Sequence, residues 1–141
     1  MPLLRFDLIE GRTQEQIKEL LDAAHRAVLA AFDVPERDRY QIVTEHKPSH
    51  LVAQDTGLGI ERTSSLVILT VITLPRSDES KQRFLSELTR EFTEHCDIQP
   101  SDVIVSFVGN RESDWSFGNG VAQYVTGDLQ STDGVLAHEK E

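Results

Sequence analysis

Pro2 is the residue of this sequence best suited to chemistry, because removal of Met1 turns its ring nitrogen into a free secondary amine. Burial beside a cationic arginine lowers the pKa of such an amine, since the protonated form is disfavoured, and neutral Pro2 could then abstract a proton. A nearby carboxylate instead favours the protonated amine, which serves as an acid or as an anchor for a carbonyl oxygen. The alternative is a proline that only begins a strand, where its missing N–H costs nothing.

Arg76 and Asp38 carry the charges that could act with this amine. Arg76 follows a proline at a predicted strand-to-helix junction, and the planar fork of its guanidinium can hold a carboxylate at two points. The alternative for Arg76 is a surface ion pair. Asp38 lies in the charged run Glu36-Arg37-Asp38-Arg39, where local ion pairing in a solvated turn would explain it without catalysis.

Trp115 and Phe117 are candidates for the wall of a binding site. They are two residues apart, so they point to the same side of an extended segment. Gly118 and Gly120 allow that segment to bend over a pocket. Packing at a subunit contact is the alternative for these rings.

The other motifs argue against several kinds of site. Cys96 is the only cysteine, so it forms no intramolecular disulfide, and we interpret it as a core thiol in preference to a nucleophile. The histidines show no metal-ligand pairing on one helix face. The glycines of segment 55–65 lack the spacing and the lysine of a phosphate-binding loop. We therefore expect neither a metal nor an organic cofactor.

Charge and hydropathy limit the partners. The formal net charge is −10 at pH 7, and no basic stripe carries interleaved aromatic residues, which argues against nucleic-acid binding. No apolar run approaches the roughly 20 residues that a membrane helix needs. Residues 1–12 lack the basic and apolar regions of a secretory signal. We expect a cytoplasmic protein with no membrane partner.

The chain of 141 residues has the length of one domain, and its first part reads as a strand, a helix and a strand. Residues 3–9 are apolar, and Thr13 and Gln16 have the spacing of a capping box. Apolar residues then recur at three- and four-residue intervals over 14–32, which predicts an amphipathic helix. Residues 39–45 have the β-branched and aromatic content of a strand.

The second part repeats this order after a long connection rich in turn formers. An apolar strand at 66–72 precedes a helix that carries Phe84 and Phe92 on its apolar positions, and a final strand follows. At an offset of 64 residues, Arg12-Thr13 lies over Arg76-Ser77, which favours an internal duplication.

Two strand-helix-strand units predict an α+β fold of α/β units, with a four-stranded sheet and both helices on one face. We expect one domain over 1–129, with units at about 2–47 and 64–109, a pocket segment at 110–129, and a polar tail at 130–141. The other face of so small a sheet needs cover. The doubly apolar strand 66–72 therefore predicts an oligomer, without fixing the number of subunits.

Several ordered blocks relate the chain to a known family. They are FDLIEGRT at 6–13, VPERDRYQ at 34–41, DTGLG at 55–59, LPRS at 74–77, and DWSFGNG followed by YVTGDL at 114–129. Together with Met-Pro at the start of a strand and the repeated unit, they resemble the tautomerase superfamily, and within it the malonate semialdehyde decarboxylase subgroup. The resemblance implies a tautomerase-like fold, a homotrimer, no cofactor and a small oxo acid as substrate.

The resemblance also implies roles for individual residues. Pro2 corresponds to the catalytic proline, Asp38 to its acidic partner, and Arg76 to one of two arginines that hold the substrate carboxylate. Four residues match the apolar wall: Trp115, Phe117, Tyr124 and Leu129.

Two positions depart from that subgroup. Leu74 stands where the decarboxylase has the first arginine of an Arg-Pro-Arg segment, and Tyr124 stands where it has a phenylalanine. The loss of one arm of a charged clamp weakens the binding of a desolvated carboxylate. An arginine such as Arg37, or one from another subunit, could replace it.

These residues leave three functions open. We favour cofactor-independent keto-enol tautomerisation of a small 2-oxo or 3-oxo acid, with Pro2 as the acid or base. The first alternative is decarboxylation of malonate semialdehyde with related hydratase activity, against which Leu74 argues. The second is a non-catalytic oligomeric binding protein of the same fold.

Overall fold

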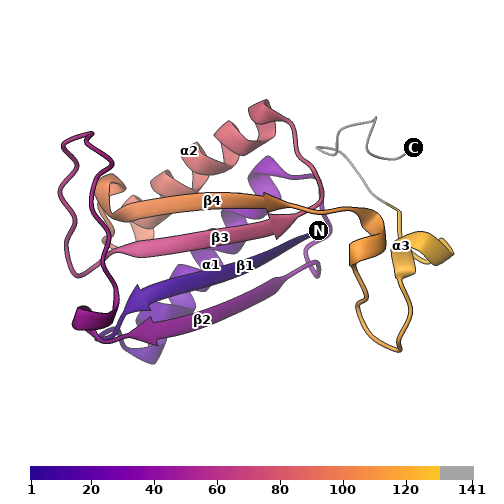
Figure 1. Ribbon diagram of the computed structural model, residues 1–141, viewed down its shortest axis with the longest axis horizontal. Coiled ribbons are helices and arrows are strands. Elements are labelled where there is room, and N and C mark those ends of the chain that lie inside the picture. Colours follow the sequence, from indigo (N-terminus) through magenta and orange to yellow (C-terminus); the bar gives the residue numbers. More distant parts are fainter. Residues whose placement is uncertain (131–141) are drawn as a thin grey trace.

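The computed structural model describes residues 1–130, in which two strand-helix-strand units follow one another (Figure 1). The first unit comprises β1 (Pro2–Ile9), α1 (Gln14–Ala31) and β2 (Tyr40–His46). The second comprises β3 (Val67–Thr73), α2 (Asp78–His95) and β4 (Val103–Gly109). Short helical turns complete the described chain: Pro48–His50, Pro100–Asp102, Glu112–Asp114 and α3 (Gln123–Thr126).

The four strands form one sheet in the order β2-β1-β3-β4. Each unit pairs its own two strands in parallel, and the units meet where β1 runs antiparallel to β3. Both helices lie behind the sheet in Figure 1. The predicted fold is therefore confirmed, with strand boundaries that differ by one residue from those expected.

Side-chain caps begin both helices at the positions that the sequence indicated. Thr13 accepts a hydrogen bond from the Gln16 N–H at 3.1 Å, and the Gln16 side chain accepts one from the Thr13 N–H at 2.9 Å. Ser77 caps α2 by accepting from the Ser80 N–H at 3.1 Å. These caps satisfy N–H groups that have no partner within the helix.

The hydrophobic core lies between the helices and one face of the sheet. Alternate residues of the two central strands point into it and are buried, which is the period-two pattern of a strand with one covered face. The rings of Phe32 and Phe84 stack at 5.3 Å within this layer. The larger buried side chains include Leu4, Phe6, Leu69, Leu88 and Phe92.

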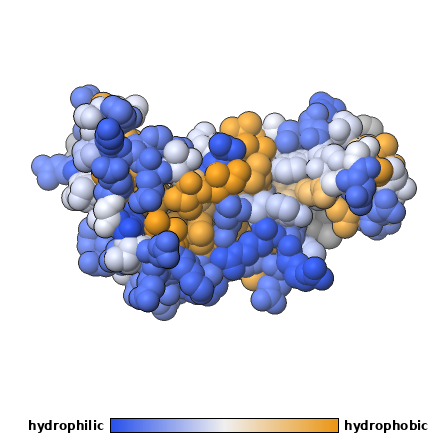
Figure 2. Space-filling model, turned by 90° about the horizontal axis from the view of Figure 1, so that it is seen from below, coloured by the Kyte–Doolittle hydropathy of each residue, from blue (hydrophilic) through white to orange (hydrophobic). Residues whose placement is uncertain are grey.

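The opposite face of the sheet is partly apolar. Tyr40, Ile42 and Val108 are exposed on it, while Ile68 and Ile72 are half-buried. Seen from below, hydrophobic surface gathers in the middle of the molecule between hydrophilic margins (Figure 2). The oligomer that the sequence suggested, and the trimer that the resemblance implied, remain predictions.

The segment after β4 lies at one end of the sheet, next to the start of the chain (Figure 1). In Figure 1 the part of the chain that follows β4 extends beyond the end of the sheet at which the N-terminus lies. No helix within residues 1–130 is long and apolar enough to cross a membrane. The predicted tail at 130–141 falls almost entirely outside the described residues, and the predicted domain limits stay predictions.

Candidate active site

The start of the chain meets Asp38 at one end of the sheet. Because β1 and β3 are antiparallel, Pro2 lies in register with Thr73, the last residue of β3. The amine of Met1 is 3.6 Å from Oδ2 of Asp38. Met1 is present here, so its primary amine stands in for the secondary amine that Pro2 would carry after Met1 is removed. The structure thus brings together two groups that are 37 positions apart in the sequence.

Arg76 supplies a buried positive charge at the same end of the sheet. It is 2% exposed, and its Nε donates to Oγ1 of Thr73 at 3.1 Å. Its guanidinium carbon lies 4.7 Å from the centre of the Phe32 ring, a cation–π contact that limits its movement. The position of Arg76 is further limited because it lies three residues after the end of β3 and directly precedes Ser77, the cap of α2.

The terminal amine is shifted toward its neutral form. Burial lowers its pKa from 8.0 to about 5, and the charge of Arg76 acts in the same direction. The charge and hydrogen bond of Asp38 oppose this shift. The contact with Asp38 has the distance of an ion pair, but burial and Arg76 outweigh it, so the amine is neutral at pH 7. A neutral amine can accept a proton.

Asp38 is partly withdrawn from water in this arrangement. Burial raises the pKa of its carboxyl group, while the amine, Arg76 and His25 act in the opposite direction. The Asp38 N–H donates to the Pro35 carbonyl at 3.0 Å. A ring nitrogen of His25, buried on α1, lies 2.8 Å from the Glu36 carbonyl. These contacts hold the turn so that Asp38 faces the amine.

The segment after β4 contributes an aromatic cluster centred on Phe117. Its ring stacks on Trp115 at 5.6 Å, meets Tyr124 edge-on at 5.8 Å, and lies 5.8 Å from Tyr40 of β2. The Trp115 indole N–H donates to Oδ1 of Asn110 at 2.7 Å. Burial, followed by the charge of Asp38, raises the pKa of Tyr124 to about 12, so its hydroxyl keeps its proton at neutral pH.

A cavity of about 280 Å³ lies where these parts meet. Of the predicted site residues it is lined by Asp38, Phe117, Tyr124 and Leu129, together with Met1. Trp115 and Arg76 are not among its described lining residues: Trp115 packs against Phe117, and Arg76 acts on the amine and Asp38 through its charge.

The cavity is also lined by Tyr40, which the sequence did not single out, and by Arg37, which it suggested only as a replacement for the missing carboxylate-binding arginine. Tyr40 begins β2 and contacts Phe117, and Arg37 comes from the turn that holds Asp38. Both belong to the block 34–41 that carried the resemblance, which is the signal that could have marked them. Leu74 also lines the cavity, with an apolar side chain at the position where the resemblance implied an arginine.

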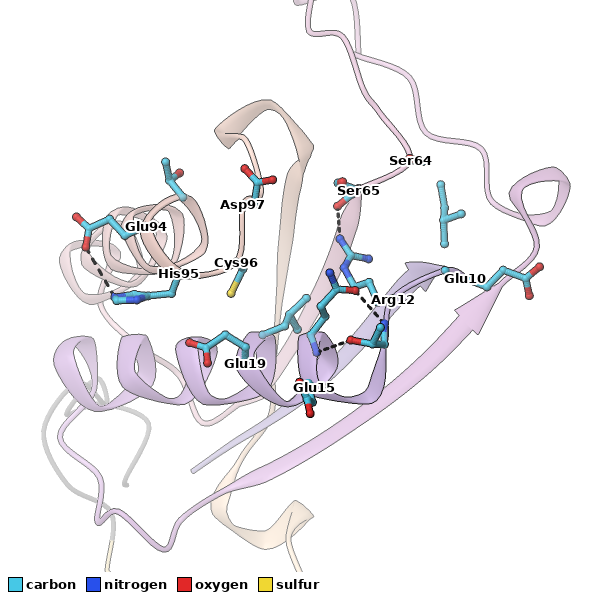
Figure 3. Close-up of a pocket in the computed structure, with 16 residues that line it drawn as sticks. Glu10, Arg12, Glu15, Glu19, Ser64, Ser65, Glu94, His95, Cys96 and Asp97 are labelled. Carbon is cyan, nitrogen blue, oxygen red and sulfur yellow. Dashed lines mark hydrogen bonds and ion pairs between the residues drawn. The ribbon is translucent and has the colours of Figure 1, made fainter.

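A second hollow of about 850 Å³ lies at the other end of β1 (Figure 3). Arg12 lies in it, and its Nη2 donates to the Ser65 carbonyl at 2.7 Å. The labelled acidic side chains around it include Glu10, Glu15 and Glu19 (Figure 3). Cys96 also lines this hollow. Burial raises the pKa of its thiol to about 11, so this cysteine is a poor nucleophile at neutral pH.

Metal binding finds no support in the geometry. Within residues 1–130, no three histidine, cysteine, aspartate or glutamate side chains gather closely enough to hold a metal ion. The absence of a metal and of a cofactor remains a prediction from the sequence.

Comparison with known proteins supplies the family. The family described as Tautomerase enzyme matches residues 38–118, and a second family with the same description matches residues 2–60. The chain belongs to the tautomerase family. The probable tautomerase YrdN of Bacillus subtilis (strain 168) is 54% identical over 129 residues, which cover 92% of this chain and 100% of YrdN.

Two solved structures carry the comparison further. One is of a malonate semialdehyde decarboxylase that was solved as the wild type, as a variant with its first residue, a proline, changed to alanine, and in an inactivated form. That work gives a structural basis for the decarboxylase and hydratase activities of that enzyme. It has 55% identity and a TM-score of 0.89, covering 91% of this chain and 99% of that one.

The other is the FG41 malonate semialdehyde decarboxylase inhibited by 3-bromopropiolate, with 43% identity and a TM-score of 0.86, covering 90% of this chain and 97% of that one. These findings confirm the resemblance to the malonate semialdehyde decarboxylase subgroup and show an enzyme of the tautomerase or decarboxylase type.

Proposed function

We propose that this tautomerase-family chain catalyses keto-enol tautomerisation of a small 2-oxo or 3-oxo acid, with the amine of Pro2 as the base after Met1 is removed. The observation that carries the proposal is a buried terminal amine, here that of Met1, beside Asp38 and the charge of Arg76; burial and Arg76 lower its pKa to about 5, and we expect the Pro2 amine to be shifted in the same direction. An amine with this pKa is neutral at pH 7 and can accept a proton from carbon. The relative of 55% identity that begins with proline supports the same position for the base.

The proton transfer needs little more than the groups in this cavity. Neutral Pro2 takes a proton from the carbon next to the substrate carbonyl, and the C–H electron pair moves into the enolate. The protonated Pro2 amine then gives this proton to the enolate oxygen, which yields the enol and restores the neutral amine, and the reverse path returns the proton to carbon. The buried charge of Arg76 draws the carboxylate toward the amine, and the Tyr124 hydroxyl, which keeps its proton, can donate to the developing oxyanion.

The apolar wall serves this chemistry by excluding water. The walls of the cavity include Leu74, Phe117 and Leu129, and its volume lies just below the range of about 300–1,000 Å³ typical of ligand pockets, which suits a small acid. Electrostatic interactions are stronger where water is excluded. Met1 itself occupies part of the cavity lining, so its removal would free both the proline nitrogen and space for substrate.

Decarboxylation of malonate semialdehyde is the second candidate. It is favoured by the 55% and 43% identities to enzymes of that name and by the contact of Asp38 with the terminal amine. In that reaction a protonated Pro2 and Asp38 would polarise the aldehyde oxygen, the bond to the carboxylate would break, and the electron pair left on carbon would take a proton. This route needs a protonated amine at pH 7.

Two measurements on the mature protein test the proposal. Mass spectrometry first establishes that the chain begins at Pro2, and NMR with ¹⁵N-labelled proline then gives the pKa of its amine. Turnover of phenylenolpyruvate and of malonate semialdehyde is compared between wild type and Pro2→Ala. We expect ketonisation of phenylenolpyruvate, an amine that is neutral at pH 7, and a loss in kcat of about 10²–10⁴-fold in Pro2→Ala.

Three outcomes would count against tautomerisation by Pro2. Full turnover in a folded Pro2→Ala protein would exclude proline as the base. An amine protonated at pH 7, together with turnover of malonate semialdehyde alone, would favour the decarboxylase. A mature chain that retains Met1 and is fully active would exclude any role for a free proline nitrogen.

A further inference from the structure

The cavity beside the terminal amine has an uneven distribution of charge. Among its described lining residues, Asp38 carries a negative charge, and Arg37 is the one side chain that carries a positive charge. Leu74 is 1% exposed and lines the cavity with an apolar side chain, at the position where the resemblance implies an arginine. A substrate carboxylate that enters this cavity therefore has one guanidinium to meet at its wall.

Arg37 is available for such a contact, unlike its neighbour Arg39. The Arg39 side chain donates to Asp22 at 2.8 Å and to Gln41 at 2.8 Å, which ties it to α1 and β2. Within residues 1–130, Arg37 forms no hydrogen bond or ion pair and is exposed. Its side chain can move to meet a ligand without breaking a contact inside this part of the protein.

We propose that Arg37 binds the substrate carboxylate directly and replaces the arginine that Leu74 does not provide. This inference rests on the proposed function in so far as the ligand is a small oxo acid. The planar guanidinium holds a carboxylate through two parallel hydrogen bonds, which also sets its orientation. Arg37 therefore determines which acids bind and how their reacting carbon is placed.

The position of Arg37 fits this role. It directly precedes Asp38, whose carboxyl group lies 3.6 Å from the terminal amine, and both side chains line the same cavity. The turn that carries them is held by the hydrogen bonds from the Asp38 N–H to the Pro35 carbonyl and between His25 and the Glu36 carbonyl. A carboxylate on Arg37 thus lies within a small molecule's length of the amine.

With Arg37 in this role, one of the two carboxylate-binding arginines comes from a different part of the fold. In the related decarboxylases, by resemblance, both arginines belong to the segment after the third strand. Here Arg76 remains there, buried, and Arg37 approaches from the turn between α1 and β2. Because Arg37 binds the carboxylate from that turn, the cavity wall at Leu74 stays apolar. The site therefore accepts an acid that is hydrophobic at the end remote from its carboxylate.

Binding of an acid and of its neutral analogue tests the role of Arg37 without any turnover. Pyruvate and pyruvamide are titrated into the mature protein, and the NMR signal of the indole N–H of Trp115, the only tryptophan, reports binding through its stack on Phe117. We expect Arg37→Gln to raise the Kd for pyruvate about tenfold, as the loss of a charged hydrogen bond does. The Kd for pyruvamide should stay unchanged. Equal effects on both ligands, or none on pyruvate, would overturn the proposal.

Two further variants sharpen the test. Arg39→Gln removes a neighbouring positive charge that is tied elsewhere, and it should leave the affinity for pyruvate unchanged. Leu74→Arg, added to Arg37→Gln, places a guanidinium at another point of the same cavity wall, where the resemblance implies one, and should restore pyruvate binding. A double variant that folds, by circular dichroism and thermal unfolding, yet fails to regain binding would contradict the exchange of one arm for the other.

The proposed activity can fail independently of this inference. If wild type turns over neither phenylenolpyruvate nor malonate semialdehyde, the proposed function is wrong, but the pyruvate titration still decides whether Arg37 binds carboxylate. If turnover is found, Arg37→Gln should raise KM about tenfold and change kcat much less, because the contact is made in both the bound and the transition state.

Discussion

The two strand-to-helix junctions of the molecule have the same local pattern but different surroundings. Arg12 and Thr13 follow β1, and Arg76 and Ser77 follow β3; in each pair the hydroxyl residue caps the next helix. Because β1 and β3 are antiparallel, the two junctions lie at opposite ends of the sheet. Each junction thus places an arginine that is at least partly buried beside the N-terminus of a helix.

The difference lies in what each arginine faces. Arg76 lies close enough to the terminal amine and to Asp38 to shift the pKa of both, and it stacks on Phe32. Arg12 donates to the Ser65 carbonyl, and its hollow has acidic walls. An arginine partly or fully withdrawn from water at such a junction does not by itself mark an active site. Of the two, only Arg76 has an ionisable group and an apolar cavity next to it.

Arg76→Gln and Arg12→Gln test most directly whether the two arginines differ in their effect on the terminal amine. Loss of the Arg76 charge removes a cause of the low amine pKa, so the pKa rises and the acidic limb of kcat/KM moves to higher pH. We expect kcat/KM at pH 7 to fall about 100-fold, since both base and carboxylate attraction suffer. Measurement of kcat/KM against pH, with phenylenolpyruvate as substrate, checks this.

The Arg12 variant is the matched control for that measurement. Arg12→Gln should lower the free energy of unfolding by about 1–3 kcal/mol through loss of its charged hydrogen bond to Ser65, with no change in the pH profile. Chemical denaturation measures this loss. Were the Arg12 variant to shift the acidic limb as the Arg76 variant does, the two ends of the sheet would not differ in the way we infer.

Asp38→Asn tests the negative charge that opposes Arg76 at the end of the sheet that holds the amine. The Asp38 carboxylate raises the pKa of the terminal amine, so its removal should lower the pKa of the Pro2 amine further and move the acidic limb of kcat/KM to lower pH. We expect a fall in kcat of about tenfold, because a weaker base accepts the proton less readily. NMR titration of the Pro2 nitrogen checks the pKa directly. Asp22→Asn, which removes a half-buried carboxylate paired with Lys18 and Arg39 far from the amine in the sequence, is the control.

Cys96→Ser should have the smallest effect, because it changes the end of the sheet that lacks the amine. With a thiol pKa of about 11, roughly one molecule in 10⁴ carries a thiolate at pH 7. We expect slow alkylation by iodoacetamide at pH 7 and an unchanged kcat/KM in the serine variant. Rapid alkylation at neutral pH, or lost turnover on alkylation, would show that the second hollow takes part in the chemistry.

Local signals in the sequence determined most of the fold. The apolar period of residues 14–32, the capping box at Thr13 and Gln16, and the apolar strand at 66–72 located elements to within one or two residues. Such signals are readable because hydrogen bonding and burial within a helix or strand depend on residues a few positions apart. The repeated order of elements, with the rule for parallel crossovers, then led to the sheet.

The sequence also identified Pro2, Asp38 and Arg76 as candidates but left the protonation state of the amine open. That state depends on how deeply the amine is buried and on its distances from Asp38 and Arg76, which only the packed structure specifies. The same holds for Arg37 and Tyr40, which become part of the cavity wall through the turn between α1 and β2. Residue types reveal which chemistry is available, whereas long-range packing decides which groups meet and what charge they carry, because electrostatic energies depend on separation and exclusion of water.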